Sequence, residues 1–346
     1  MQSEKYSRDN AGQSLKKYIL LKKGELAYNH GASKAKQYGC CYELTEDEAR
    51  IPYVYHCFKV SDTEHTPYIA TALNNPKIDR QLKRLVSSSV RMDGLLNISF
   101  DDYMSVILHL PSLQEQTHIA DFLKKLDERI TVQEKLVASL KKYKRGLLNK
   151  VFSNTDGKIY PTVYLSEVAD FLQGLTYSPS DVANAGHLVL RSSNIQNGTL
   201  SFDDCVYVDK SIPESLQVKC ADVIMCVRNG SKSLVGKTAL IPVDMPKTTW
   251  GAFMMIVRSK LNDTYIFHYL NSQMFFSQVF KDTGTATINQ ITKGILNECR
   301  LPLPPVEERK KISKMLSTFD AKIYNAERTL YALMETRKAL LQQLFI

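Results

Sequence analysis

The feature that most constrains the fold of this chain is an internal repeat. Residues 110–152 align without a gap with residues 303–345, which lie 193 positions further along the chain. Identical residues recur at twelve of these positions, which in the first copy are Leu110, Pro111, Glu115, Ile119, Leu123, Asp127, Ile130, Glu134, Leu140, Leu147, Leu148 and Phe152. A repeat of this length predicts two copies of one structural element.

Each copy is predicted to form a long helix that begins just after a proline turn. Apolar residues fall at alternating spacings of four and three, as in the seam of a coiled coil. The seam residues are Ile119, Leu123, Leu126, Ile130, Val137, Leu140, Leu147 and Val151 in the first copy, and Ile312, Leu316, Phe319, Ile323, Ala326, Leu330, Leu333, Leu340 and Leu344 in the second. Because a single helix would expose this stripe to water, we expect the two copies to pack together in antiparallel orientation. Gln133, Lys144 and Arg337 interrupt the seam, and either fix its register or lie at frayed ends.

The regions that precede the two helices also resemble each other. Short apolar runs such as HLVLRSSNI, DVIMCV and FMMIVRS, separated by turn residues, predict a mainly β domain ahead of the second helix. Residues 22–31 align with residues 219–228, and 68–75 with 265–272, both at an offset of 197. Globular domains beside both helices make simple dimerisation an insufficient explanation of the heptads. The expected class is α+β, with the four parts 1–109 (first domain), 110–155 (first helical spacer), 156–302 (second domain) and 303–346 (second helical spacer).

Charge and cysteine content narrow the class of partner. The 346-residue chain carries a formal charge of +9, which favours an acidic partner, with nucleic acid first and an anionic membrane surface second. Seven cysteines without a C-x-x-C pair argue against a disulfide framework or a zinc site, and fit a reducing cytosol. The polar start MQSEKYSRDN predicts no signal peptide, and the apolar runs are too short to span a bilayer. We therefore expect a cytoplasmic protein.

The stretch RNGSKSLVGKTAL, residues 228–240, resembles a phosphate-binding loop at first sight. The Walker pattern needs four residues between its first glycine and the Gly-Lys-Thr, whereas five stand here. Only three residues separate Thr238 from Pro242, so no helix of useful length is expected to follow. The loop therefore predicts no nucleotide site, and needs another explanation.

Taken together, these motifs resemble the DNA specificity subunit of type I restriction-modification enzymes. The resemblance covers nearly the whole chain, and its most specific pieces are LPSLQEQTHIADFLKKLDERI, LPPVEERKKISKMLSTFDAKI, YLSEVADFLQG and GTATINQ. It implies two target recognition domains, each addressing half of a split DNA site, held apart by the helix pair. In that family the RNGSKSLVGKTAL element is a strand and loop that face DNA.

The resemblance also implies which side chains contact DNA. Arginine pairs with guanine, asparagine with adenine and lysine with phosphate. In the second domain the candidates are Arg191, Ser193, Asn194, Arg228, Asn229, Ser231, Lys232, Lys237, Thr285, Thr287, Asn289 and Gln290. In the first domain they are Asn29, His30, Ser33, Lys34, Lys36 and Arg91. For each of them a solvated loop or a turn is the simpler alternative. Trp250 is expected in the core, and the KKYKR run at 141–145 on a solvated helix face.

One departure from the family pattern concerns the first domain. Matching Lys22 with Lys219 places Met1 opposite Gly198, so residues from about 157 to 197 have no counterpart in the first domain. Its sheet is therefore expected to be incomplete. Either another chain completes it, or a segment has been lost, or the start lies elsewhere.

No catalytic constellation stands out in the sequence. The chain lacks the [DN]-P-P-[YF] motif and the glycine-rich loop of adenine methyltransferases, as well as a nuclease-like carboxylate cluster. We expect a non-catalytic subunit without a cofactor or metal of its own. The resemblance implies double-stranded DNA, modification (methyltransferase) subunits and restriction (motor-nuclease) subunits as partners, with S-adenosylmethionine, Mg and ATP bound by those subunits. The alternative is a coiled-coil structural or regulatory protein that binds DNA without sequence preference.

Overall fold

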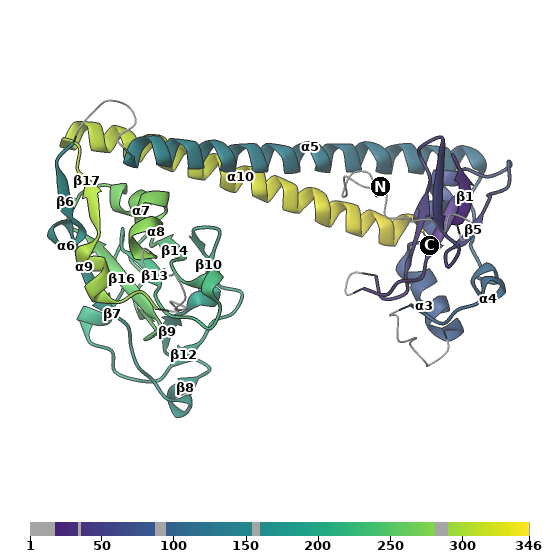
Figure 1. Ribbon diagram of the computed structural model, residues 1–346. Coiled ribbons are helices and arrows are strands. Elements are labelled where there is room, and N and C mark those ends of the chain that lie inside the picture. Colours follow the sequence, from purple (N-terminus) through teal and green to yellow (C-terminus); the bar gives the residue numbers. More distant parts are fainter. Residues whose placement is uncertain (1–17, 34–35, 87–94, 154–159, 281–289, 346) are drawn as a thin grey trace. The chain divides into compact units, whose positions relative to one another are not determined.

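The computed structural model describes residues 18–33, 36–86, 95–153, 160–280 and 290–345 (Figure 1). The chain divides into two compact units, of which the first comprises residues 1–135 and 328–346 and the second residues 136–327. Both divisions fall inside the two longest helices, α5 (Leu113–Phe152) and α10 (Val306–Leu344), so each unit contains a globular part and a segment of both helices.

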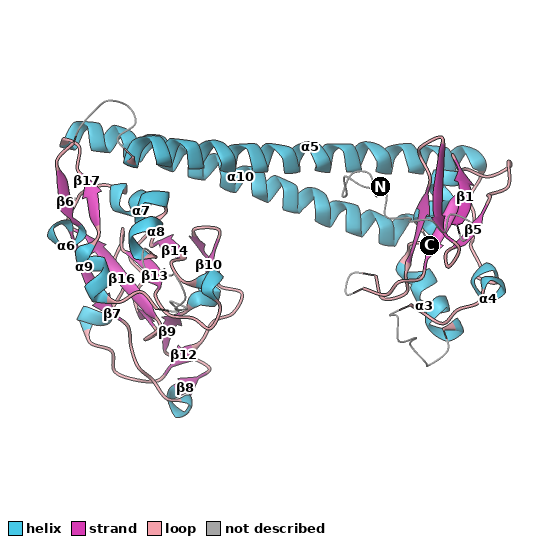
Figure 2. Cartoon of the chain, viewed as in Figure 1, coloured by secondary structure: helices cyan, strands magenta, loops and turns pink. Residues whose placement is uncertain are grey.

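The second unit is an α+β domain built on a four-stranded antiparallel sheet. Its strands are β6 (Thr162–Tyr164), β7 (Ala169–Gln173), β8 (Val182–Ala183), β9 (His187–Leu190), β10 (Ile195–Gln196), β11 (Thr199–Leu200), β12 (Tyr207–Val208), β13 (Val223–Cys226), β14 (Thr238–Leu240), β15 (Thr248–Trp250), β16 (Met254–Ser259) and β17 (Arg300–Pro302). Its short helices are α6 (Leu165–Val168), α7 (Tyr265–Leu270), α8 (Gln273–Val279) and α9 (Lys293–Glu298). The main sheet has the order β14-β13-β16-β7, a second sheet has the order β15-β9-β12-β8, and β17 pairs with β6 (Figure 2).

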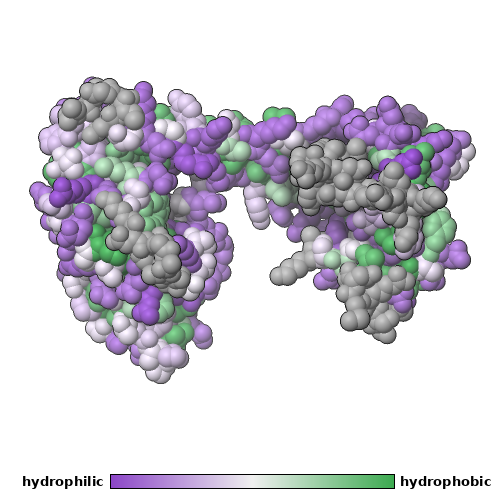
Figure 3. Space-filling model, viewed as in Figure 1, coloured by the Kyte–Doolittle hydropathy of each residue, from purple (hydrophilic) through white to green (hydrophobic). Residues whose placement is uncertain are grey.

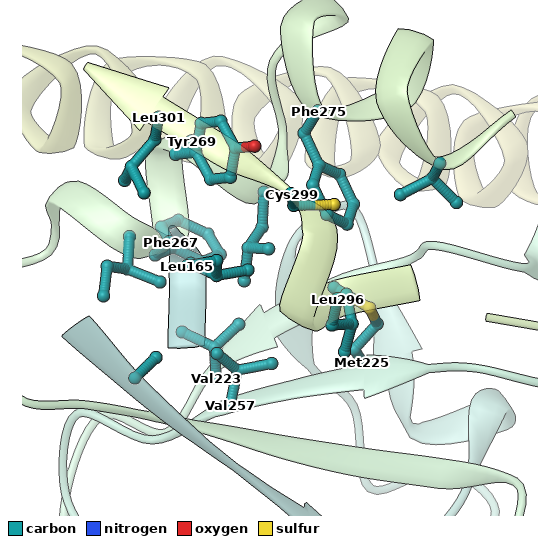
Figure 4. Close-up of a cluster of buried hydrophobic side chains, with 14 of the residues drawn as sticks. Leu165, Val223, Met225, Val257, Phe267, Tyr269, Phe275, Leu296, Cys299 and Leu301 are labelled. Atoms are coloured by element: carbon teal, nitrogen blue, oxygen red, sulfur yellow. The ribbon is translucent and has the colours of Figure 1, made fainter. Parts of the chain in front are cut away.

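The core of the second unit lies between the main sheet and the helices that cover one of its faces. Strand residues such as Val223 and Val257 meet Phe267 and Tyr269 of α7 in one buried cluster (Figure 4). The four residues of β13, VIMC, are all apolar because this strand is buried on both faces of the sheet. Trp250 is fully buried and donates its indole N–H to the carbonyl of Leu172, so the prediction of a core tryptophan is confirmed.

The first unit is smaller and contains a three-stranded sheet. Its elements are β1 (Tyr18–Lys22), β2 (Leu26–Asn29), β3 (Cys40–Glu43), β4 (Glu48–Pro52), β5 (His56–Phe58), α2 (Thr66–Ala72), α3 (Pro76–Leu85) and α4 (Phe100–Met104). The sheet has the order β3-β2-β5, while β1 pairs with β4 in a separate ribbon. In the second unit β7 pairs with β16, the equivalent of β5. Among the described residues of the first unit no strand pairs with β5 in this way, which agrees with the expected gap in the sheet.

The repeat extends to individual hydrogen bonds that flank the central strands. The N–H of Lys22 donates to the carboxylate of Glu25 at 2.7 Å, and the N–H of Lys219 donates to Asp222 at 2.8 Å, 197 positions later. In the second unit Asp222 is buried and also accepts two hydrogen bonds from the guanidinium of Arg258, at 2.8 and 2.7 Å. This bidentate pair anchors the start of β13 to β16.

A second pair of equivalent contacts ties each hairpin to its helices. The side chain of Asn74 accepts from the N–H of Cys41 at 2.9 Å, and that of Asn271 bonds the hydroxyl of Thr238 at 2.8 Å. Both asparagines follow a short helix, and Cys41 and Thr238 both lie on the returning strand of a hairpin. The β2–β3 and β13–β14 hairpins are therefore the same structural element.

The same position in each hairpin requires glycine. Gly39 and Gly236 precede the returning strands and have positive φ angles of 78° and 86°. A Cβ at Gly236 would lie 2.7 Å from the ring of Phe276. Only glycine fits such a backbone at low cost.

The long helices have the predicted seams, and within each unit their segments run antiparallel. All of the predicted seam residues are buried or half-buried. The two basic interruptions of the seam are paired with the aspartate of the other copy. Lys144 bonds Asp320 in the second unit, and Arg337 bonds Asp127 in the first, which is the equivalent pair. Of the two interpretations left open by the sequence, these interruptions therefore fix register and do not lie at frayed ends.

The Lys144–Asp320 pair continues into a buried polar cluster on α7. The ring of His268 lies 3.1 Å from the hydroxyl of Ser317 and 3.7 Å from the carboxylate of Asp320. Burial, and next the positive charge of Lys144, lowers the pKa of His268 to about 3. The imidazole is therefore neutral at physiological pH.

The outward-facing side of the helices is mostly polar, as Figure 3 shows for the visible face, with scattered exposed apolar side chains such as Phe122, Val132 and Tyr331. In the KKYKR run, Lys141 pairs with Glu327 and Lys144 with Asp320, while Lys142 and Arg145 are exposed. The prediction of a solvated helix face is thus confirmed for these last two. Neither long helix nor any other helix in the described part of the chain is long and apolar enough to cross a membrane.

Candidate nucleic-acid interface

The candidate interface lies at the carboxyl end of β13, where three of the predicted segments meet. The N–H of Ile291 donates to the carbonyl of Val227 at 2.7 Å, and Arg228 and Gln290 form an antiparallel bridge. The side-chain amide of Asn229 donates to the hydroxyl of Ser192 at 3.2 Å. The segments LRSSNI and RNGSKS and Gln290, the last residue of GTATINQ, are therefore brought to one edge of the sheet, although they lie far apart in the sequence.

Arg228 is the exposed cation at the centre of this edge. Its guanidinium carbon lies 5.4 Å from the ring centre of Phe253, close enough for a cation–π contact. The two side chains line a pocket of about 260 Å³ together with Gln173, Gln290, Thr292 and Lys293. An arginine held by an exposed aromatic ring beside amide side chains provides both a charge and hydrogen-bond donors for a base edge or a phosphate.

The hairpin loop that follows Arg228 presents two more cations. The side chain of Asn229 accepts from the N–H of Ser231 at 2.9 Å, which closes a tight turn. Ser231, Lys232 and Lys237 are exposed. No carboxylate in the described part of the chain lies within ion-pair distance of Arg228 or of either lysine. Unpaired cations on a short loop favour an anionic partner.

The loop has no features of a nucleotide site. Lys232–Leu234 form a single 3-10 turn, and Thr238 begins β14. Its hydroxyl bonds Asn271, so it is not free to hold a metal. The interpretation of residues 228–240 as a strand and loop is confirmed, because a strand stands where a Walker motif requires a helix.

In the LRSSNI segment the predicted residues have different roles. Ser193 is exposed, and Arg191 pairs with Asp204 at 2.9 Å with about a third of its side chain exposed. Asn194 is fully buried, accepts from the N–H of Arg191, and donates to the carbonyls of Ser201 and Asp204. The prediction that Asn194 contacts DNA is therefore wrong, because all its polar groups hold the loop together.

In the first unit the equivalent edge is also present. The N–H of Leu96 donates to the carbonyl of His30 at 2.9 Å, as Ile291 does to Val227. The ring of His30 is buried, with one nitrogen 3.0 Å from the carbonyl of Leu96 and the other bonded to the carbonyl of Val54. The prediction that His30 contacts DNA is wrong, since both ring nitrogens are occupied inside the fold.

The other first-unit candidates lie on the β2–β3 hairpin. Asn29 is half-buried and accepts from the N–H of Gly31 at 2.9 Å, a turn like that of Asn229. Ser33 is exposed, and its hydroxyl accepts from the N–H of Lys36. The ammonium of Lys36 lies 3.3 Å from the carbonyl of Asn74. The remaining candidates, Lys34, Arg91, Thr285, Thr287 and Asn289, lie outside the described residues.

Sequence reasoning missed several residues of this edge. Phe253, which is 59% exposed, Gln173 and Lys293 all line the pocket beside Arg228. An aromatic residue in a turn between two strands was the available signal for Phe253. Among the described residues no group of three acidic, histidine or cysteine side chains is placed to hold a metal.

Comparison with known proteins identifies the family. The model of the type I restriction modification DNA specificity domain matches residues 160–334, which is half of the chain. The chain therefore belongs to this family.

Individual relatives have the same description. A type I restriction enzyme specificity subunit of Salmonella potsdam, StySPI, is 29% identical over 173 residues, covering 47% of this chain and 37% of that protein. The EcoKI specificity subunit of Escherichia coli K12 is 29% identical over 166 residues, covering 46% of this chain and 36% of that protein. The alignments thus span little more than a third of each of these two relatives.

Solved structures support the fold. The S subunit of a type I restriction-modification system from M. genitalium has a TM-score of 0.61 at 15% identity, over 96% of this chain and 85% of that one. A chain from a structure describing complex assembly and conformational transition of the type I R-M system has a TM-score of 0.58 at 17% identity, over 94% and 82% of the two chains.

Proposed function

We propose that this chain reads a DNA sequence for a type I restriction-modification complex. The observation that carries the proposal is the edge at the end of β13, where Arg228, Lys232 and Lys237 stand exposed beside Gln290, without an acidic partner among the described residues. Family membership supports the same conclusion. The specific contacts would come from Arg228, Asn229 and Gln290, and the phosphate contacts from the two lysines.

The two-fold repetition supports a split DNA site. Each unit contains the same hairpin, with a turn-forming asparagine at its start and a positive-φ glycine at its end. Two reading modules on one chain impose a fixed spacing between two half-sites. A helix such as α5, with 40 residues, is roughly 60 Å long, which is about the length of seventeen or eighteen base pairs.

The chemistry would belong to partner subunits. In this proposal the chain binds DNA and supplies no catalytic group, modification subunits bind S-adenosylmethionine and methylate adenine, and restriction subunits use ATP and Mg to cleave. The polar outer faces of α5 and α10 are the surfaces available for docking such subunits. A cytoplasmic location follows from this partnership.

Selection from a random double-stranded DNA library tests the proposal. The chain is purified with its modification subunit, and three forms are compared: wild type, Arg228→Gln and Lys219→Gln. Lys219 is an exposed lysine just before β13, near the opposite end of that strand, and serves as the matched control. We expect wild type and K219Q to enrich the same two-part sequence, and R228Q to lose preference in one half by about 1–3 kcal/mol per base contact. Enrichment without sequence preference would instead support a coiled-coil protein that binds DNA non-specifically.

A further inference from the structure

The exit segment of the second unit, residues 299–303 just ahead of α10, pairs with a strand from the start of that unit. β17 pairs with β6 in antiparallel register, with Leu301 opposite Val163. The N–H of Leu303 donates to the carbonyl of Pro161, and the N–H of Leu165 donates to the carbonyl of Cys299, each at 2.8 Å. This pairing covers the exit segment, so that Leu301 and Pro302 are buried.

The tyrosine that precedes this strand makes a further contact. The hydroxyl of Tyr160 donates to Oε1 of Glu308 in the first turn of α10, at 2.7 Å. Residues 160–165, with the sequence YPTVYL, thus form an extended segment whose backbone and side chains both bind the exit segment.

The first unit has the same exit segment, held by equivalent contacts. Gln81 bonds both the N–H and the carbonyl of Ile107, at 3.0 and 2.9 Å. Gln278 does the same to Arg300, at 2.8 Å in both cases. These pairs fix the backbone orientation of both exit segments. The carbonyl of Cys299 and the N–H of Leu303, which bond the β6 segment in the second unit, therefore correspond to the carbonyl of Val106 and the N–H of Leu110 in the first.

In the described part of the first unit this edge is open. Within the described ranges no strand pairs with residues 106–110, and neither the Val106 carbonyl nor the Leu110 N–H has a partner. His109 is exposed where Pro302 is buried, and Leu110 is 40% exposed where Leu303 is half-buried.

A pocket marks the same edge. It has a volume of about 500 Å³ and is lined by Tyr68, Leu110, Pro111, Glu115 and Ile119 among others. Glu115 is the counterpart of Glu308. Its Oε2 accepts from the N–H and the hydroxyl of Ser112. Among the described residues no group donates to its Oε1, and the equivalent atom of Glu308 accepts from Tyr160.

We propose that this open edge binds an extended segment of a second polypeptide by β-strand addition. The segment would resemble residues 160–165: an aromatic residue with a hydroxyl, then proline, then a β-branched residue and leucine at alternate positions. Exposed strand edges bind peptides in this way, through main-chain hydrogen bonds with side-chain pockets for specificity.

Two segments of the chain itself fit this role poorly. Residues 160–165 are already paired inside the second unit. Residues 1–17 contain no proline, valine, isoleucine or threonine, so they offer neither the proline nor the β-branched residue. This inference goes beyond the proposed DNA reading, and its test needs no DNA. The proposal of β-strand addition can therefore fail while the proposal of DNA reading stands, and the reverse.

Fluorescence anisotropy with the full-length chain tests the proposal. The probe is a labelled peptide of residues 158–175, KIYPTVYLSEVADFLQGL, and the control peptide carries Val163→Pro, which removes the N–H that pairs with the exit segment. We expect saturable one-to-one binding of the first peptide and about tenfold weaker binding of the second.

The chain variant Leu110→Pro removes the N–H at the open edge. Its counterpart Leu303 lies between Pro302 and Pro304, so proline is compatible with this segment, and circular dichroism checks the fold. We expect about tenfold weaker binding to L110P. No binding of the probe peptide, or equal binding to wild type and L110P, would overturn the proposal, as would competition by a peptide of residues 1–17.

Discussion

Removing the two loop lysines should change the salt dependence of DNA binding by a calculable amount. Lys232 and Lys237 are exposed and unpaired among the described residues, so each is free to neutralise one phosphate. The slope of log Kd against log salt is about 0.9 per neutralised phosphate. The double variant Lys232→Gln, Lys237→Gln should therefore lose about 1.8 from that slope. Between roughly 50 and 200 mM salt, the wild type would lose about twelvefold more affinity than the variant.

The assay is anisotropy of a labelled DNA duplex over a salt series, with Lys219→Gln as the matched single control. Lys219 is also exposed but lies near the other end of β13, so its removal should leave the slope unchanged. If the double variant kept the wild-type slope, the loop would not contact phosphates. The placement of the interface at this edge would then be refuted.

Three further predictions concern stability, each followed by urea unfolding of the full-length chain. Asp222→Asn leaves the half-buried Arg258 without its bidentate partner and should cost about 3 kcal/mol. Asp181→Asn, in the more exposed pair with Lys210, should cost clearly less, and equal costs would contradict the reasoning. Gly174→Ala places a Cβ 2.1 Å from the carbonyl oxygen of Gly251 and should cost more than about 2 kcal/mol, while Gly146→Ala, with open space on a helix, should gain up to about 1 kcal/mol. His268 has its pKa lowered to about 3, so the unfolded chain binds a proton more readily between about pH 6.5 and 3 and stability falls as pH falls through that range. Relative to His268→Gln, which removes this contribution but retains Lys144 and Asp320, the wild type should lose about 2 kcal/mol between pH 7.5 and 5, and parallel pH profiles would show that the imidazole is not buried as a neutral group.

The helices could be predicted well because their signal is periodic and local. A seam at spacings of four and three fixes which face is buried, and α5 begins two residues after Pro111, just after the predicted proline turn. The partners of Lys144 and Arg337 were not predictable from spacing alone, since each lies on the other helix.

The candidate site was predicted in part. The segments that meet at the end of β13 were identified from their polar residues, but the fact that they meet depends on long-range pairing. His30 and Asn194 were misassigned because sequence alone does not distinguish a polar side chain that is buried and hydrogen-bonded from one that faces solvent. For His30 the repeat contained the missing information, because the offset of 197 places it opposite Val227 in an apolar run.

The most direct test of the central claim is adenine-methylation sequencing of cells that express a type I modification subunit with and without this chain. The proposal predicts a new two-part DNA motif that is methylated only when the chain is present. A motif with a single defined half would show that only one unit reads DNA. No new motif, in cells where the same modification subunit methylates with a related specificity subunit, would contradict the claim that this chain directs sequence-specific modification.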